Sequence, residues 1–179
     1  LFFFFFIMGE NGHEWIGKER WEKVDYLSHV LYNLGHFYEA ATAYYQATGK
    51  RKILDIAIKS ADLVDSEFGY GKIENYPGHQ EIEIGLVKLY RVTGEKRYLD
   101  LAKFFLDIRG KGDLGEKTTY NQSHLPVVEQ TEAVGHSVRG AYMWTGMADV
   151  AALTGDQQYI EKKKKIWEDV VHKKLYITG

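Results

Sequence analysis

The sequence predicts an all-α fold in which helices pair into hairpins, one helix of each pair buried and the other partly exposed. Two observations predict it. Three Thr-Gly pairs, each followed by a charged residue, divide the chain into helical hairpins, and the segments before and after each pair differ in hydrophobic pattern. With 179 residues, 45% of them hydrophobic and 27% charged, the composition is typical of a globular domain.

The glycines of these pairs are Gly49, Gly94 and Gly155. Glycine readily adopts the left-handed conformation that ends a helix, so each position is expected to be the corner of a hairpin. The corners are 45 and 61 residues apart, which is too irregular for a short-period helical repeat array. The extra length falls in 110–127, a Gly-rich polar loop of the kind that often carries function.

The segments on the two sides of a corner indicate two layers. Segments 29–48 and 133–153, which precede corners, are apolar or aromatic on nearly every side and are expected to be buried. The segments after the corners carry apolar residues on one helical face only, so we expect them outside. Repeated inner and outer helices predict a solenoid or a closed toroid. The outer stripes are Leu54, Ala57, Ile58, Ala61 and Val64, then Tyr98, Leu101, Ala102 and Phe105, then Tyr159, Ile166, Trp167 and Val170.

Each inner helix is expected to open near a Gly-His pair, at His36, His79 and His136. These histidines precede the corner threonines by 12, 14 and 18 residues, which predicts that all three lie toward the same end of the inner layer. A lone histidine near a helix start is usually a structural hydrogen-bonding residue. Three histidines in a comparable place indicate a binding site, and a zinc site formed by the three is an open alternative.

Glutamates accompany these histidines: Glu39 follows the first, Glu81 and Glu83 follow the second, and Glu132 precedes the third. An offset of three or four residues places a carboxylate and an imidazole on one helix face. Neutral histidine offers one donor and one acceptor, and an ionised carboxylate offers acceptors, a combination that suits the hydroxyls of a sugar. The glycine beside each histidine is expected to let a ligand approach the backbone. His13, His29, His124 and His172 show no comparable pattern, although His124 lies in the polar loop.

Charge and composition exclude several classes of partner. With 23 basic and 25 acidic side chains the formal charge is −2, which gives no electrostatic footprint for nucleic acid or an anionic membrane. The chain has no cysteine, which excludes disulfides and thiolate metal sites and leaves a cytoplasmic, periplasmic or secreted bacterial location undecided. The apolar segment 1–8 is too short to span a bilayer.

The stretches 29–36, 77–90, 128–136 and 174–179 closely resemble glycoside hydrolase family 127, the β-L-arabinofuranosidases and their relatives. The resemblance covers roughly 26–179 and leaves 1–25 as an N-terminal segment. It implies an (α/α)6 barrel, of which about three hairpins, or half a barrel, are present. It also implies a retaining exo-glycosidase that removes terminal β-L-arabinofuranose from plant-type glycans, with His36, His79 and His136 contacting the sugar.

The resemblance further implies a zinc ion held by one glutamate and three cysteines, one of which is the nucleophile, and a separate glutamate as acid/base. In family members all of these residues follow the Tyr-Ile-Thr-Gly motif, which stands at 176–179 here, and this chain has no cysteine. We therefore expect no catalytic residue and no metal ligand within it, and zinc only in the full-length enzyme. The chain alone is therefore expected to be inactive. Val30 stands where family members usually have glutamate.

Other functions remain open at the level of sequence. An unsaturated uronyl hydrolase, another α/α-barrel glycosidase, would need a basic residue for its acidic sugar, and Arg139 is the candidate. A helical-repeat interaction module would bind a protein partner on an open curved surface and have no affinity for sugar. An open half toroid would also leave inner helices uncovered, which predicts self-association into a homo-oligomer.

Overall fold

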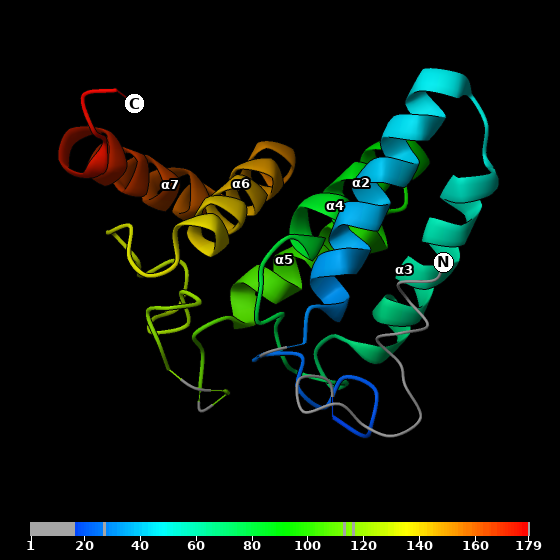
Figure 1. Ribbon diagram of the computed structural model, residues 1–179, viewed down its shortest axis with the longest axis horizontal. Helices are drawn as coiled ribbons and strands as arrows, with labels where there is room; N and C mark the ends of the chain where they lie inside the picture. The colour runs from blue at the N-terminus through cyan, green and yellow to red at the C-terminus, as the bar shows by residue number, and fades with distance from the viewer. Residues whose placement is uncertain (1–16, 27, 113, 116, 179) are drawn as a thin grey trace.

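The computed structural model describes residues 17–26, 28–112, 114–115 and 117–178, so the apolar segment 1–8 lies outside the described residues. The described part is all-helical, as predicted, and its helices follow one another as hairpins (Figure 1). None of these helices combines the length and the apolar character needed to cross a membrane. The elements are α2 (Val30–Thr48), α3 (Lys52–Glu67), α4 (Ile82–Thr93), α5 (Lys96–Ile108), α6 (Ser137–Thr154), α7 (Gln157–Asp169) and the π-helix η1 (Val170–Lys174).

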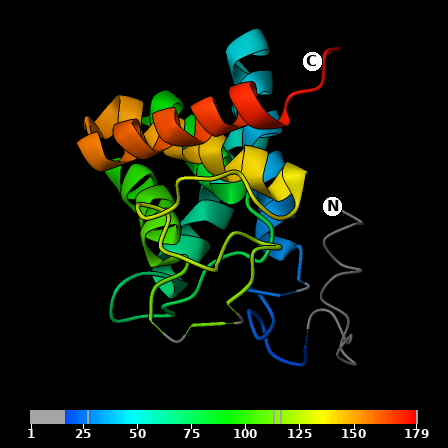
Figure 2. The same cartoon turned by 90° about the vertical axis from the view of Figure 1, so that its left-hand side faces the viewer.

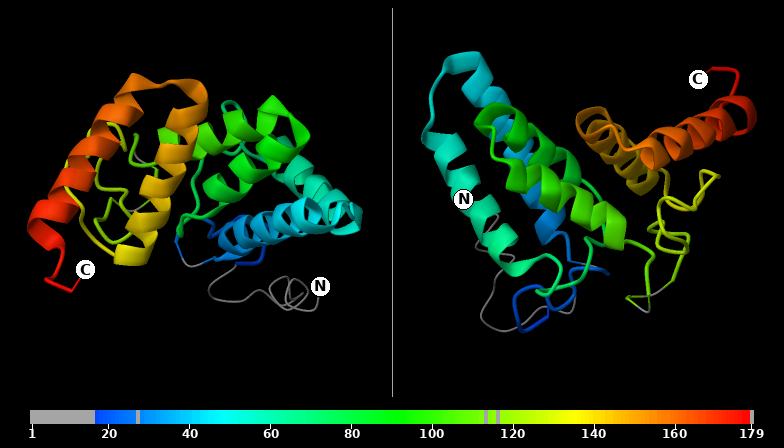
Figure 3. Two further views of the ribbon diagram at one scale, coloured as in Figure 1. Left: turned by 90° about the horizontal axis from the view of Figure 1, so that it is seen from above. Right: turned by 180° about the vertical axis from the view of Figure 1, so that it is seen from behind.

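Contacts between the helices confirm the pairing. α4 packs against α2 on one side and α6 on the other, so the three helices that precede corners form one layer. Each is followed by its partner: α3 packs against α2, α5 against α4, and α7 against α6. Two further views show the three hairpins in sequence, with the first and last helices at opposite ends (Figure 3). The predicted pairing of the helices is therefore correct. The predicted burial is wrong for segments 29–48 and 133–153, because α2 and α6 have only six and seven buried residues, whereas α5, expected outside, has eight.

The three corners are built in the same way. Gly49, Gly94 and Gly155 have φ angles of 70°, 74° and 70°, and each donates its N–H to a carbonyl four residues earlier. The preceding threonine hydroxyl donates to the carbonyl four residues before it and accepts the N–H two residues after it. The Thr-Gly pair therefore satisfies orphan groups at the end of one helix and fixes the start of the next.

The helices α2 and α4 approach each other through two glycines. A Cβ atom on Gly35 would lie 2.7 Å from the backbone nitrogen of Ile82, and one on Gly85 would lie 2.5 Å from the carbonyl oxygen of Gly35. No side chain fits between the two backbones at this crossing. The close approach makes α4 the most enclosed helix, with residues 82–87 all buried.

The chain outside the helices also packs on the core. Val24 is fully buried, and the Trp21 ring lies 5.2 Å from that of Phe68. The predicted boundary between 1–25 and 26–179 stays a prediction. At the other end of the domain, the connection between α5 and α6 runs beneath α6 and α7 (Figure 2) and contains the polar loop expected at 110–127.

Candidate functional site

The structure brings His36, His79 and His136 into one cluster with two tyrosines. The rings of His79 and His136 have centroids 6.2 Å apart. Tyr32 lies 4.5 Å from His36 and 4.3 Å from His79, again between ring centroids. Tyr142 of α6 lies 5.8 Å from each of the same two rings. The predicted histidines therefore meet where α2, the start of α4 and the start of α6 converge.

Their places along the helices differ from the prediction. His79 precedes α4 and His136 is the N-cap of α6, but His36 lies inside α2, six residues after its first residue. The expectation that each inner helix opens near a Gly-His pair is wrong for α2, which begins at Val30 because its apolar pattern continues back to that residue without a helix breaker. Helix α6 begins at Ser137 rather than at 133, because Gly135 has a φ of 79°, outside the helical region.

The cluster has further members that were not predicted from the sequence. His29, the N-cap of α2, has its ring 5.6 Å from Tyr32 and 5.7 Å from His79. Tyr120 of the polar loop lies 5.3 Å from His136. A signal for the first of these was present, because positions 29, 32 and 36 are spaced to share one helix face. Only the tertiary arrangement shows Tyr120 and Tyr142.

Hydrogen bonds fix the tautomer of His79. Its Nδ1 lies 2.7 Å from the carbonyl oxygen of Gln80, which can only accept, so Nδ1 carries the proton and Nε2 is an acceptor. Burial lowers the pKa of His79 from its usual 6.5 to about 4; the carbonyl of Gln80 opposes this shift, and the charge of Arg139 adds to it. The imidazole is therefore neutral near pH 7.

His136 has the opposite arrangement. Its Nδ1 accepts the backbone N–H of Arg139 at 3.4 Å, as an N-cap of α6. In the neutral ring the proton then lies on Nε2, which becomes a donor. His79 and His136 thus present an acceptor and a donor in neighbouring positions, the pair of functions that a hydroxyl group needs.

Two carboxyl groups lie near His36: that of Glu39, as predicted, and that of Glu81, which was expected beside His79. The Nδ1 of His36 is 3.3 Å from Oε1 of Glu81, which is fully buried. One ligand atom each from His36, Glu39 and Glu81 lie within 4.8 Å of one another. Among the described residues it is this group, and not the three histidines of the zinc alternative, that comes close enough to share a cation. Burial, and then the nearby carboxyl of Glu39, raises the pKa of Glu81 well above its usual range.

Two sequence expectations about the neighbours of the histidines are wrong. Glu132 is exposed and lies outside any helix, so its offset from His136 does not place the two on one face. The glycines beside the histidines do not leave room for a ligand. A Cβ on Gly78 would lie 2.5 Å from the carbonyl oxygen of Tyr26, and Gly135 packs in the same way against the backbone of Thr119. These glycines permit close chain packing.

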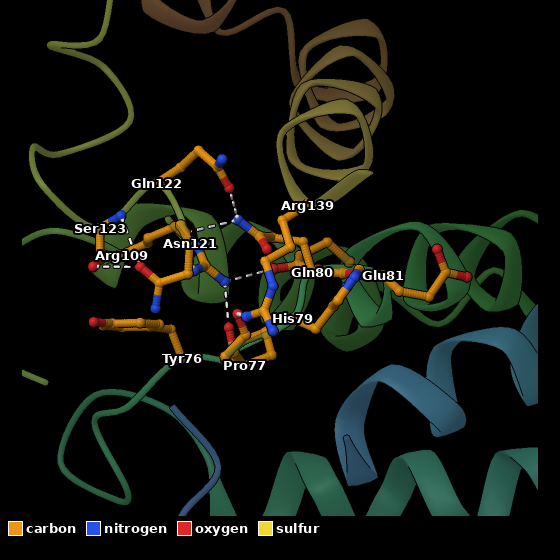
Figure 4. Close-up of polar contacts among 12 residues, drawn as sticks. Tyr76, Pro77, His79, Gln80, Glu81, Arg109, Asn121, Gln122, Ser123 and Arg139 are labelled. Atoms are coloured by element: carbon orange, nitrogen blue, oxygen red, sulfur yellow. Dashed lines mark hydrogen bonds and ion pairs between the residues drawn. The ribbon is translucent and has the colours of Figure 1, made fainter. Parts of the chain in front are cut away.

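A buried arginine organises the chain below the cluster (Figure 4). Arg109, at the end of α5, donates to the carbonyl oxygens of Asn121 at 2.9 Å and Pro77 at 2.5 Å. Its guanidinium lies 4.7 Å from the centre of the Tyr76 ring and 3.9 Å from a carboxylate oxygen of Glu83. Arg109 therefore connects the segment that carries His79 to the polar loop.

Gln122 connects the same loop to His136. Its Oε1 accepts from the Gln80 side chain at 2.9 Å, and its Nε2 donates to the carbonyl oxygens of Val134 at 2.9 Å and His136 at 3.2 Å. The amide thus spans the two segments that carry His79 and His136, and Figure 4 shows its bond to Gln80. No local pattern in the sequence indicated this role, because all of these partners are distant along the chain or in irregular structure.

Arg139, the candidate partner for an acidic sugar, is already engaged. It is 5% exposed, donates to the carbonyl oxygen of Gly78 and lies 4.7 Å from the centre of the Tyr120 ring. Burial lowers its pKa. Its contacts hold the start of α6 against the segment before α4, which does not favour the uronyl hydrolase alternative.

Comparison with known proteins gives consistent results. The family model described as "Beta-L-arabinofuranosidase, GH127 catalytic domain" matches residues 6–179. The chain is 41% identical, over 92% of its length, to a non-reducing end beta-L-arabinofuranosidase of Bifidobacterium longum subsp. longum, of which it covers 28%. The chain therefore spans little more than a quarter of that relative.

Solved structures agree. One described as a GH127 beta-arabinofuranosidase is 61% identical, with a TM-score of 0.89 over 93% of this chain and 26% of that one. A GH127 beta-L-arabinofuranosidase from Geobacillus stearothermophilus T6 is 44% identical, with a TM-score of 0.84 over 89% of this chain and 28% of that one. Because these matches are all to glycoside hydrolases, they do not favour the alternative of a helical-repeat module that binds a protein partner. The chain belongs to glycoside hydrolase family 127, and it forms part of the α/α-barrel catalytic domain.

Proposed function

We propose that this chain supplies part of the sugar pocket of a retaining exo-glycosidase that removes terminal β-L-arabinofuranose from plant-type glycans. The observation that carries the proposal is the convergence of His36, His79 and His136, with an acceptor on His79 and a donor on His136. The similarity to β-L-arabinofuranosidases supports the choice of L-arabinofuranose as the bound sugar. The substrate is then an L-arabinofuranoside.

Each part of the cluster has a role in this proposal. The imidazoles bind hydroxyls of the furanose and fix its orientation, which is the positioning part of catalysis. Tyr32 and Tyr142 lie among the imidazoles and offer apolar ring surface to the carbon skeleton of the sugar. Because burial keeps His79 neutral, its Nε2 stays an acceptor across the physiological pH range. A neutral pocket also suits an uncharged sugar better than a uronate.

The catalytic groups are not assigned to this chain. The family resemblance implies zinc in the full-length enzyme, but the 179 residues contain no cysteine and do not fit a zinc site built from three cysteines. We propose that the zinc ligands, the nucleophile and the acid/base lie elsewhere in the full-length protein. The contribution of this chain is binding and orientation.

Two measurements on the 179-residue chain test the proposal. Saturation-transfer NMR should detect methyl β-L-arabinofuranoside bound to the chain, with methyl β-D-glucuronide failing to compete. Incubation with a chromogenic β-L-arabinofuranoside and added zinc should release no product. Binding of the glucuronide in preference to the arabinoside would sink the assignment of substrate. Zinc-dependent turnover by this chain would show that the assignment of the catalytic groups is wrong.

A further inference from the structure

A line of polar groups leads from the core to His36. Glu83 is 1% exposed, and its Oε1 lies 3.9 Å from Arg109. The Oε2 of Glu83 accepts the backbone N–H of Glu81 at 3.0 Å, at the start of α4. Glu81 in turn approaches Nδ1 of His36 at 3.3 Å. The position of the Glu81 backbone is therefore fixed by a buried ion pair rather than by solvent-exposed contacts.

The close crossing of α2 and α4 leaves Glu81 little freedom. A Cβ on Gly35 would lie 2.8 Å from Cγ of Glu81 and 2.7 Å from its carbonyl carbon. The side chain of Glu81 therefore packs directly against the residue that precedes His36. This packing fixes the position of the Glu81 carboxyl group relative to the imidazole of His36.

The carboxyl group of Glu81 lacks the partners that a buried carboxylate needs. Both of its oxygens are buried and have no hydrogen-bond partner among the described residues; Nδ1 of His36 lies 3.3 Å from Oε1 without the geometry of a hydrogen bond. A carboxylate oxygen of its neighbour Glu39 lies within 4.8 Å of one of its own, and two carboxyl groups can form a hydrogen bond only when one of them carries a proton. A buried pair with a single proton avoids the cost of placing two negative charges together.

Several charged or titratable groups surround this pair. His36 faces it from α2, and Glu83 and Lys88 belong to α4. Tyr142 approaches from α6, and Arg109 of α5 reaches the pair through Glu83. Two positive charges act on these carboxyl groups: Lys88 lowers the pKa of Glu81, and Arg109 lowers that of Glu83. They do not cancel the effect of burial, because the pKa of each glutamate is still raised.

We propose that Glu81 is a positioning residue: it shares one proton with Glu39, and the negative charge of this carboxyl pair, 3.3 Å from Nδ1 of His36, holds the imidazole proton on Nδ1, which leaves Nε2 of His36 as an acceptor for a ligand. This inference deepens the proposed function and rests on it for the identity of the ligand. His36 then has the same tautomer as His79 and the opposite one to His136. The cluster has two acceptors and one donor in its neutral state.

A divalent cation is the alternative occupant of the group formed by His36, Glu39 and Glu81. Three protein donors leave the coordination shell of such an ion to be completed by water. The His36 side chain is 41% exposed and can be reached by a ligand, whereas Glu81 is excluded from solvent and its oxygens cannot contact the water of a hydrated ion. A proton satisfies the same carboxyl pair without a hydration shell, so the structure favours the proton.

The test uses NMR of the labelled 179-residue chain after dialysis against a chelator. Imidazole ¹⁵N shifts report the tautomer of His36, and side-chain ¹³C shifts report ionisation of Glu81. The expected result is an Nδ1–H tautomer of His36 and a Glu81 that stays protonated above the ordinary range of glutamate. Glu39→Gln should lower the apparent pKa of Glu81 by about one unit or more, because the charge that shared the proton is gone.

Variants at Glu81 separate positioning from packing. Glu81→Met removes the oxygen that faces Nδ1 and should abolish the preference of His36 for Nδ1–H, whereas Glu81→Gln keeps an oxygen there and should restore it. Glu132→Gln, at an exposed carboxylate, is the matched control and should change neither readout. If Glu81→Met does not fold, the Glu39→Gln variant tests the inference instead: an unchanged apparent pKa of Glu81 in that variant would contradict the shared proton.

Three outcomes would overturn the inference. Glu81 could ionise in the ordinary range of glutamate, or His36 could keep its tautomer in the folded Glu81→Met variant. The His36 and Glu81 resonances could also saturate with one equivalent of Zn²⁺ or Ca²⁺, which would make the group a metal site. None of these readouts requires sugar. If the chain fails to bind arabinofuranoside while the tautomer responds as expected, only the proposed function fails.

Discussion

The Nδ1 atom of His79 lies 2.7 Å from the carbonyl oxygen of Gln80. The side chain of that same Gln80 donates to Asn121 at 3.0 Å and to Gln122 at 2.9 Å. The residue that sets the tautomer of one imidazole is thus also the anchor of the loop that leads to the next one. The geometry of the cluster and the folding of the polar loop are therefore coupled.

The buried, neutral state of His79 predicts a pH effect on stability. Its pKa is lowered from 6.5 to about 4 on folding, so the unfolded chain binds a proton between these values and the folded chain does not. The free energy of unfolding should fall as pH drops from 6.5 toward 4, with a contribution from this residue of up to about 3 kcal/mol. Urea denaturation of His79→Gln should show a shallower fall than the wild type.

The matched control for this effect is His172→Gln, because His172 is exposed in η1. That variant should keep the pH dependence of the wild type. Parallel curves for the wild type and His79→Gln would show that protonation of His79 is not linked to unfolding.

The triple role of Gln122 predicts a large effect of its removal. Gln122→Ala leaves the carbonyls of Val134 and His136 without their donor and the Gln80 side chain without one of its acceptors. We expect a loss of about 2–4 kcal/mol in the free energy of unfolding, because buried polar groups lose their partners. Gln157→Ala, at an exposed position, should cost less than about 0.5 kcal/mol. Equal stability of the two variants would contradict the role assigned to the amide.

The sequence predicted the hairpins because their signals are local. A Thr-Gly pair ends a helix by its own hydrogen bonds, and the helical spacing of apolar residues marks the helix that follows. Counting back from the corners therefore placed His36, His79 and His136 at one end of the inner layer. The structure brings these three histidines together, and their binding of a sugar stays a prediction.

Other features of the site could not be predicted, because they depend on contacts between segments that are distant in the sequence. Gly35 and Gly78 lie beside histidines in the sequence, but the space next to them is filled by other parts of the backbone. The buried Arg109 and Gln122 bind carbonyl groups of irregular structure, which no periodic pattern marks. Tyr142 reaches the cluster only because α6 packs against α4.

The glycine crossing of α2 and α4 predicts a strong dependence on side-chain size. Gly35→Ala would place a Cβ 2.7 Å from backbone atoms that cannot move aside. We expect it to lower the free energy of unfolding by about 1–3 kcal/mol or more, despite a gain of about 1 kcal/mol in helix propensity. Gly146→Ala, whose Cβ would lie 3.2 Å from the Cβ of Glu83, should cost clearly less. Equal midpoints in urea for the two variants would refute the crossing as a close backbone contact.

The open end of the helical layer predicts self-association. Val138 and Leu153 of α6 are 46% and 37% exposed. Exposed apolar side chains on a helix at the end of the layer favour contact with a second copy. Sedimentation equilibrium should show a mass that rises with concentration, and the Val138→Ser/Leu153→Ser variant should lower it. Ile53→Ser, on the outer helix α3, serves as control. A monomeric mass at all concentrations would rule out this association.

The central claim is that the histidine cluster binds an arabinofuranoside, and titration of the ¹⁵N-histidine-labelled chain tests it most directly. With methyl β-L-arabinofuranoside, the imidazole resonances of His36, His79 and His136 should shift and saturate together, while His172 stays unchanged. Methyl β-D-glucuronide should shift none of them. Imidazole resonances that do not respond to the arabinoside, or that respond equally to both sugars, would contradict the account.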